Sequence, residues 1–111
     1  MLLGRKSSAL EARAARIRAD LAGRGSGDPA IQTLEVDLSD QGETRRAAAE
    51  ALDRFPAIDG LILSVVTLGQ HGPTILPDGH ELTFATNVMG PFLFNFRCLQ
   101  FNEDFNHRAP P

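Results

Sequence analysis

The sequence predicts an α/β protein with a doubly wound parallel sheet. Short apolar runs of strand length alternate with stretches of helical periodicity, in the order strand, helix, strand, helix, strand, helix. Such alternation is typical of parallel strands joined by right-handed helical crossovers. A chain of 111 residues is long enough for one domain. We expect this domain to span 1–98, with about three strands and three helices, and 99–111 to form a loose C-terminal tail.

The first predicted unit is a strand that ends at Met1–Leu3, followed by a helix. Ser8 and Glu11 have the spacing of a capping box, which predicts the start of the helix at Ser8. Gly23 is the residue type that ends helices, so the helix is expected to stop there. After a turn-rich loop, the β-branched and apolar residues of 31–36 predict the second strand.

The second unit repeats this pattern. Asp40 and Glu43 form another capping-box pattern, which opens an alanine-rich helix that is expected to run to about Phe55. The nearly continuous apolar run Leu61–Val66 predicts a third strand, buried on both faces as in a parallel sheet.

The third predicted helix contains two residues that helix interiors normally exclude, Gly90 and Pro91. Asp78 is the expected N-cap. Pro91 has no N–H, so the carbonyl of Asn87 loses its intrahelical donor. Two interpretations are open, because Pro91 either merely bends a packed helix or frees a carbonyl that binds something. The apolar face is predicted from residues at spacings of three, four and seven, namely Leu82, Ala85, Met89, Phe92, Leu93 and Phe96.

Composition and charge exclude several functional classes. The net charge of −3 and the lack of a basic run argue against nucleic acid, and no apolar run reaches the roughly 20 residues of a membrane helix. The single cysteine, Cys98, fits a reducing compartment, so we expect a cytoplasmic protein with a buried structural thiol. His71, His80 and His107 lack the spacing of metal ligands, and no metal site is predicted.

Polar residues at the ends of the predicted strands are the candidate binding residues, because open parallel sheets bind ligands at that edge. Arg5 is either a ligand for a ribose 2′-phosphate or an exposed arginine near a helix start. Asp37 either accepts hydrogen bonds from an adenine amino group or caps the next turn.

Four features, in this order along the chain, resemble the short-chain dehydrogenase/reductase family. They are the strand end Gly4-Arg5, the turn Val36-Asp37-Leu38-Ser39, the strand Ile58-Asp59-Gly60-Leu61-Ile62-Leu63 and the helix Phe84-Ala85-Thr86-Asn87-Val88-Met89-Gly90. The resemblance covers about residues 1–96 and is closest to retinol-dehydrogenase-like and fungal oxidoreductase members. It implies a partial Rossmann-like domain whose first strand is missing, and NAD(P)-dependent hydride transfer between an alcohol and a carbonyl.

The resemblance also implies roles for individual residues. Arg5 would favour NADP as the cofactor, while Asp37 and the Leu38 backbone would hold its adenine. Ser64 stands in the turn that follows the third strand and offers a hydroxyl to the cofactor. Asn87 would be the catalytic asparagine, whose main-chain carbonyl fixes a water in a proton relay. The implied partners are a small carbonyl or alcohol substrate and, through the last helix, a second copy in a homo-oligomer.

The chain departs from the family pattern in three ways. Val65 and Val66 replace the small residues of the family's Asn-Ala-Gly turn, and the Gly-rich phosphate loop would precede residue 1. The chain has no Tyr, and Lys6 is its only Lys, so the family's Tyr-x-x-x-Lys pair is absent. We therefore expect an oxidoreductase truncated so that this chain alone lacks catalysis. The alternatives are a non-enzymatic remnant that acts through protein–protein contact, and an incomplete gene model.

The missing first strand has a structural consequence. It would leave the run Leu61–Val66 without its usual neighbour in the sheet. Either Met1–Leu3 pairs with this run instead, or its backbone groups stay unpaired and stability is marginal.

Overall fold

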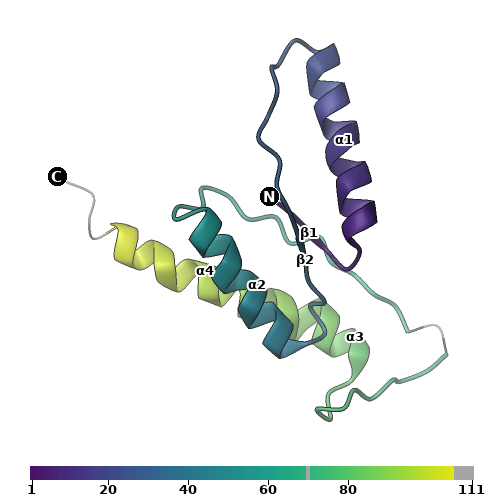
Figure 1. The fold of residues 1–111 in the computed structure, drawn as a ribbon. Coiled ribbons are helices and arrows are strands. Elements are labelled where there is room, and N and C mark those ends of the chain that lie inside the picture. The colour runs from purple at the N-terminus through teal and green to yellow at the C-terminus, as the bar shows by residue number, and fades with distance from the viewer. Residues whose placement is uncertain (70, 107–111) are drawn as a thin grey trace. The chain divides into compact units, whose positions relative to one another are not determined.

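The computed structural model describes residues 1–69 and 71–106, with side chains described as far as Leu99. It is an α/β structure whose described part contains one two-stranded parallel sheet (Figure 1). The chain divides into two compact units, Met1–Val36 and a second unit that begins at Asp37. We describe each unit by itself.

The first unit is a strand–helix–strand crossover. Strands β1 (Leu2–Gly4) and β2 (Thr33–Glu35) pair in parallel, with Leu2 opposite Thr33 and Gly4 opposite Glu35. Helix α1 (Ser7–Gly23) connects them, packs on both strands and buries Ala14. The predicted first helix and its stop at Gly23 are therefore confirmed, as is the parallel pairing of the first two strands.

The predicted capping box at the start of α1 is wrong. The helix begins one residue earlier, and the Glu35 carboxylate of β2 accepts hydrogen bonds from the backbone N–H of Ser7 at 2.8 Å and from its hydroxyl at 2.5 Å. Glu11 instead accepts from the Thr33 hydroxyl at 2.5 Å. The neighbouring strand thus supplies the acceptor that the local sequence pattern assigned to the helix itself.

The second unit opens with helix α2 (Gln41–Arg54), which begins where the sequence predicted. The side chain of Asp40 accepts a hydrogen bond from the N–H of Glu43 at 2.9 Å, as expected for an N-cap. α2 packs against α4 (Gly90–Asn106), as Figure 1 shows. Its buried face consists of small side chains that allow a close approach: Thr44, Ala47, Ala48 and Ala51.

The last predicted helix is divided into three elements. A single turn, α3 (Leu82–Phe84), leads into a π-helix, η1 (Ala85–Met89), which continues as α4. The N-cap is Glu81 rather than Asp78, because the Phe84 N–H donates to the Glu81 carboxylate at 2.9 Å.

The end of α4 lies further along the chain than expected. The helix runs to Asn106, so 99–106, which the sequence analysis assigned to a loose tail, is helical. Residues 107–111, including His107, lie outside the described residues. Within the described ranges, no helix combines the length and the apolar character needed to cross a bilayer.

The predicted third strand is wrong. In the described part of the chain, Leu61–Val66 forms neither a strand nor a helix, and Ile62 and Val66 are 90% and 75% exposed rather than buried. A strand requires a neighbour, and β1 pairs with β2 instead of this run. The sheet accordingly has two strands where about three were predicted.

The predicted apolar face of the last helix is only partly correct. Ala85 is buried, but Phe92 and Phe96 are 67% and 47% exposed and stack on each other with ring centroids 6.1 Å apart. The buried residues of α4 are instead Phe94 and Cys98, together with Gly90 and Pro91 at its start. A π turn contains an extra residue, which rotates everything after it relative to the face that a continuous α-helix would present.

Candidate functional site

The Asn87 side chain, on η1, binds the backbone of Thr67. The Thr67 N–H donates to Asn87 Oδ1 at 2.7 Å, and Asn87 Nδ2 donates to the Thr67 carbonyl at 2.8 Å. The Asn87 amide thus bonds to both the N–H and the carbonyl of Thr67, the two groups that a neighbouring strand would otherwise pair. Because Thr67 directly follows the apolar run, this pair of bonds fixes the end of that run to the helix.

The backbone of the helix is irregular at the same place. The Gly90 N–H donates to the carbonyl of Ala85, which is the i to i+5 pattern of a π-helix. The Thr86 carbonyl therefore loses its α-helical donor to Ala85, and the Asn87 carbonyl has none because Pro91 lacks an N–H. Short π segments occur frequently at functional sites. Both carbonyl oxygens thus lose the donor that a regular α-helix would give them.

Gly90 lies against the backbone of Leu38. A Cβ atom on Gly90 would lie 2.1 Å from the Leu38 carbonyl oxygen and 2.8 Å from the Leu38 Cβ. The start of α4 thus packs directly on the backbone of the turn that follows β2. This contact brings Asp37 and Leu38 next to the helix segment that carries Asn87.

Asp37 holds its own turn together. Its Oδ1 atom accepts from the Ser39 N–H at 2.9 Å and from the Ser39 hydroxyl at 2.7 Å. The capping interpretation of Asp37 is therefore observed. The role in adenine binding stays a prediction, and it would use the carboxylate oxygen that does not bond to Ser39.

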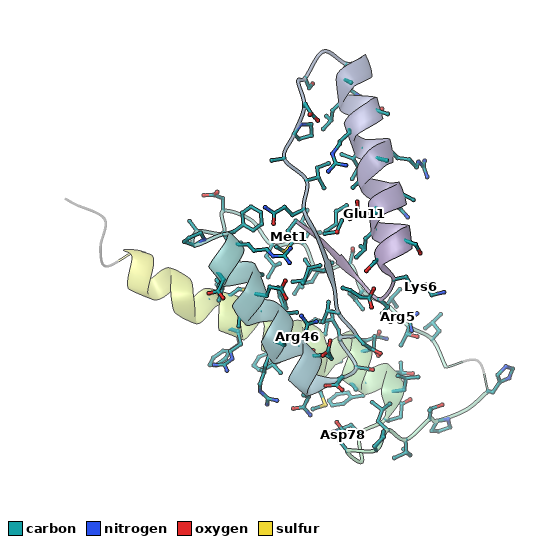
Figure 2. All side chains as sticks on the ribbon, viewed as in Figure 1. Met1, Arg5, Lys6, Glu11, Arg46 and Asp78 are labelled. Carbon is teal, nitrogen blue, oxygen red and sulfur yellow. The ribbon has the colours of Figure 1, made fainter. Side chains whose placement is uncertain are left out.

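Arg5 and Ser64 are both exposed. Arg5 follows β1 in the first unit, beside Lys6 at the start of α1, as Figure 2 shows. The other predicted site residues belong to the second unit. Ser64 lies in the middle of the apolar run, three residues before Thr67. The structure thus places the turn with Asp37 and Leu38 beside the start of α4, close in sequence to Asn87, and the roles assigned to all five residues stay predictions.

Sequence reasoning missed Thr67 as a partner of Asn87. No local signal exists for it, because two hydrogen bonds between residues twenty positions apart leave no periodicity. The Leu38 contact of Gly90 was also missed, because a glycine inside a helical pattern does not by itself name the residue that it packs against.

The loop before α3 is folded back on itself. The Leu82 N–H donates to the Thr74 carbonyl at 2.8 Å, and the Leu76 N–H donates to the His80 carbonyl at 2.8 Å. Asp78 accepts from the His80 N–H at 3.0 Å, and this backbone bond lowers the pKa of Asp78. Asp78 therefore orders the loop rather than capping the helix.

Other chemistry has little support in the described residues. No group of three His, Cys, Asp or Glu side chains in 1–69 and 71–106 is placed to hold a metal ion. Cys98 is buried, and desolvation by burial raises the pKa of its thiol. A raised pKa lowers the thiolate fraction, so Cys98 is a poor nucleophile, as expected of a structural thiol.

Comparisons with known proteins give one relative of note. The chain is 34% identical over 68 residues to the short-chain dehydrogenase/reductase bet4 of Neocamarosporium betae, a match that covers 59% of this chain and 20% of the relative. The match therefore spans one fifth of the relative's length. No protein-family profile matches the chain, and no solved structure matches it significantly.

Proposed function

We propose that this chain is the cofactor-binding part of an NAD(P)-dependent oxidoreductase of the short-chain dehydrogenase/reductase type. The observation that carries the proposal is the position of Asn87 in a π-helical segment, four residues before Pro91. The side chain of Asn87 bonds to the backbone of Thr67. The relative that shares 34% of 68 residues bears the same family name, which supports the proposal independently. On this view, 1–98 is part of a Rossmann-like domain in the cytoplasm.

The residues present fit a dinucleotide phosphate in their chemistry. Arg5 and Lys6 are exposed, and a guanidinium group suits a ribose 2′-phosphate, so NADP is the proposed cofactor. The second oxygen of Asp37 and the Leu38 N–H would hold the adenine, and Ser64 would offer its hydroxyl. When bound, the nicotinamide would exchange a hydride with a small alcohol or carbonyl. The Asn87 carbonyl would hold a water molecule.

This chain alone does not contain the groups for proton transfer in that family. It has no Tyr, and its only Lys is Lys6. We therefore propose that it binds the cofactor without turning over a substrate. Reading the DNA on both sides of the coding sequence tests this directly. The proposal predicts a Gly-rich loop encoded upstream and a Tyr-x-x-x-Lys motif downstream, whereas the absence of both would contradict it.

Binding is tested by titrating the chain with NADPH and NADH and following nicotinamide fluorescence. Arg5→Glu is expected to weaken NADPH binding by about tenfold or more and to leave NADH binding nearly unchanged, because only NADPH carries the 2′-phosphate. Arg13→Glu, which changes an exposed arginine further along α1, is the matched control. Failure to bind either dinucleotide at millimolar concentration would rule out the proposal. If the chain alone reduced a carbonyl substrate, the proposal that it has no catalytic activity would be wrong.

A non-enzymatic role through protein contact is the second candidate. The observation that favours it is the amount of exposed apolar side chain in the second unit, on the 62–68 stretch and on α4, namely Ile62, Leu63, Val65, Val66, Leu68, Phe92, Phe96 and Leu99. The two roles are distinguished by measuring the molar mass of the chain with light scattering during size-exclusion chromatography, together with its NADPH binding. A monomer at all concentrations that binds NADPH supports the oxidoreductase role, and an oligomer without dinucleotide binding supports the contact role.

A further inference from the structure

The stretch Leu61–Thr67, which we call the 61–67 segment, has a backbone that lacks hydrogen-bond partners in the described chain except at Thr67. The structure shows no helix, strand, turn or bend between Gly60 and Gly69. From Leu61 to Val66, no backbone group bonds to any described residue, and Thr67 is held only by Asn87. An unpaired row of N–H and C=O groups is a template for pairing with another strand.

The side chains of the segment are apolar on both faces. Side chains alternate along extended chain, so Ile62 and Val66 share one face with Ser64, while Leu63 and Val65 share the other. Ile62 and Val66 are 90% and 75% exposed, and Leu63 and Val65 are 43% and 41% exposed. No Asp, Glu, Lys or Arg occurs between Asp59 and Asp78, so no charge opposes the approach of an identical segment.

The order of residues in the segment is self-complementary. Turned end for end about Ser64, it places Ile62 opposite Val66 and Leu63 opposite Val65. The apolar side chains at 62, 63, 65 and 66 then face apolar partners in cross-strand pairs, Leu61 faces Thr67, and the two Ser64 hydroxyls face each other. Short, uncharged, β-branched segments without proline are also the type that pairs with copies of itself.

We propose that the 61–67 segment is a homodimerisation strand, which pairs antiparallel with the 61–67 segment of a second copy about a two-fold axis through Ser64. A second copy is the occupant that fits, because both partners then present the same palindromic, uncharged surface. Two-fold pairing is the commonest form of homo-oligomer. Strand addition would satisfy the backbone groups that the described chain leaves unpaired. This inference does not depend on the proposed oxidoreductase function.

The exposed phenylalanines of α4 are a weaker candidate for the same role. Phe92 and Phe96 already stack on each other within one helix, and the helix backbone needs no partner. In contrast, the described chain supplies no backbone hydrogen bond to residues 61–66, and the side chains of 62–66 are exposed.

The first test is sedimentation of the full chain over a range of concentrations, with variants that probe the register. Ile62→Lys alone is expected to weaken the dimer at least about tenfold, because a cation then faces the apolar Val66. The double variant Ile62→Lys/Val66→Glu places opposite charges across both pairs and is expected to restore the dimer to within a few-fold. Ala49→Lys, at an exposed position on α2, is the control and should change nothing.

The second test is disulfide cross-linking. Residues that face each other across antiparallel strands have Cα atoms about 4.5–5.5 Å apart, within reach of a disulfide. Ser64→Cys should therefore cross-link readily. Ile62→Cys should not, because its two copies would lie about four residues, or roughly 13 Å, apart along the strands. The unmodified chain is the control, since its only thiol, Cys98, is buried.

Several results would overturn the proposal. They are a monomer at every concentration, a dimer that Ile62→Lys leaves intact, failure of the double variant to restore the dimer while its circular dichroism matches the parent, and equal cross-linking at both positions. Protection of the 61–66 amides from hydrogen exchange under monomeric conditions would also overturn it, because the chain would then pair the segment internally.

Discussion

Gly90 and Leu38 are in backbone contact, and a single methyl group on Gly90 would lie 2.1 Å from the Leu38 carbonyl oxygen. We expect Gly90→Ala to destabilise the second unit by about 1–3 kcal/mol, because either the helix or the turn must move to relieve the overlap. In an open helix interior the same change normally stabilises by roughly 0.5–1 kcal/mol. Urea unfolding followed by circular dichroism measures the difference.

The matched control for that substitution is Gly23→Ala at the end of α1, where a Cβ atom meets nothing within 4 Å. We expect a change of no more than about 0.5–1 kcal/mol, in the stabilising direction. Equal stability of the two variants would show that the close approach of Gly90 to Leu38 is not a constraint on the fold.

The hydrogen bonds between Asn87 and Thr67 provide the second prediction. Asn87→Leu keeps the branched shape of the side chain but leaves the Thr67 N–H and carbonyl without their partner, so we expect a loss of about 1–3 kcal/mol. Hydrogen exchange at the Thr67 amide should become faster by a corresponding factor. Asn95→Leu, on α4 of the same unit, is the control and should cost less than about 0.5 kcal/mol. Unchanged exchange at Thr67 in Asn87→Leu would contradict the role of the amide.

The third prediction concerns the carboxylate that caps α1 from the neighbouring strand. Glu35→Ala removes the acceptor for both the Ser7 N–H and the Ser7 hydroxyl, and we expect a loss of about 1 kcal/mol. The effect should appear as faster hydrogen exchange in the first turn of α1. Asp20→Ala removes an exposed carboxylate near the other end of that helix and should have little effect. If both variants behave alike, the contact between β2 and the start of α1 contributes nothing measurable.

The fourth prediction concerns the pKa of Glu81 and the loss of stability at acid pH. Hydrogen bonds from the backbone N–H groups of Thr83 and Phe84 lower the pKa of Glu81 below its ordinary value of 4.5. A lowered pKa in the folded state means that the carboxylate contributes stability above pH 4.5, and that this contribution disappears as the pH falls through the folded pKa. An NMR titration of the Glu81 carboxyl should show a midpoint below that of an unstructured peptide. Glu81→Gln should flatten this part of the acid dependence of stability, and an unshifted midpoint would contradict the cap.

The sequence predicted those elements whose signals are local. Asp40 and Glu43 mark the start of α2 correctly, because an N-cap bond forms within three residues and needs no distant partner. α1 likewise ends at Gly23 as predicted, although the glycine with the left-handed conformation that ends it is Gly25, at φ 71°. The break in the last helix was also predictable, since Pro91 removes a donor wherever the rest of the chain lies.

The predictions that failed concern elements that depend on residues far away in the sequence. The run Leu61–Val66 has the composition of a buried strand, but composition cannot supply the neighbouring strand that it needs. The same limit applies to the start of α1, where a carboxylate from β2 replaces the predicted capping box. In the candidate site, the free carbonyl of Asn87 stays a prediction from the spacing to Pro91, whereas the side-chain contact of Asn87 with Thr67 is visible only in three dimensions.

The π-helical segment Ala85–Met89 has a consequence for insertions and deletions. One surplus residue in a helix turns everything downstream by about 100° about its axis. Removing a single residue from this segment would let the π turn become an α-helical turn, with Pro91 still leaving one carbonyl without a donor. The deletion would also rotate Asn87 away from its backbone partner, or rotate the phenylalanine pair toward the interior. Homologues that have lost one position here should therefore keep the helix but lose the asparagine, which alignment of related genes can check.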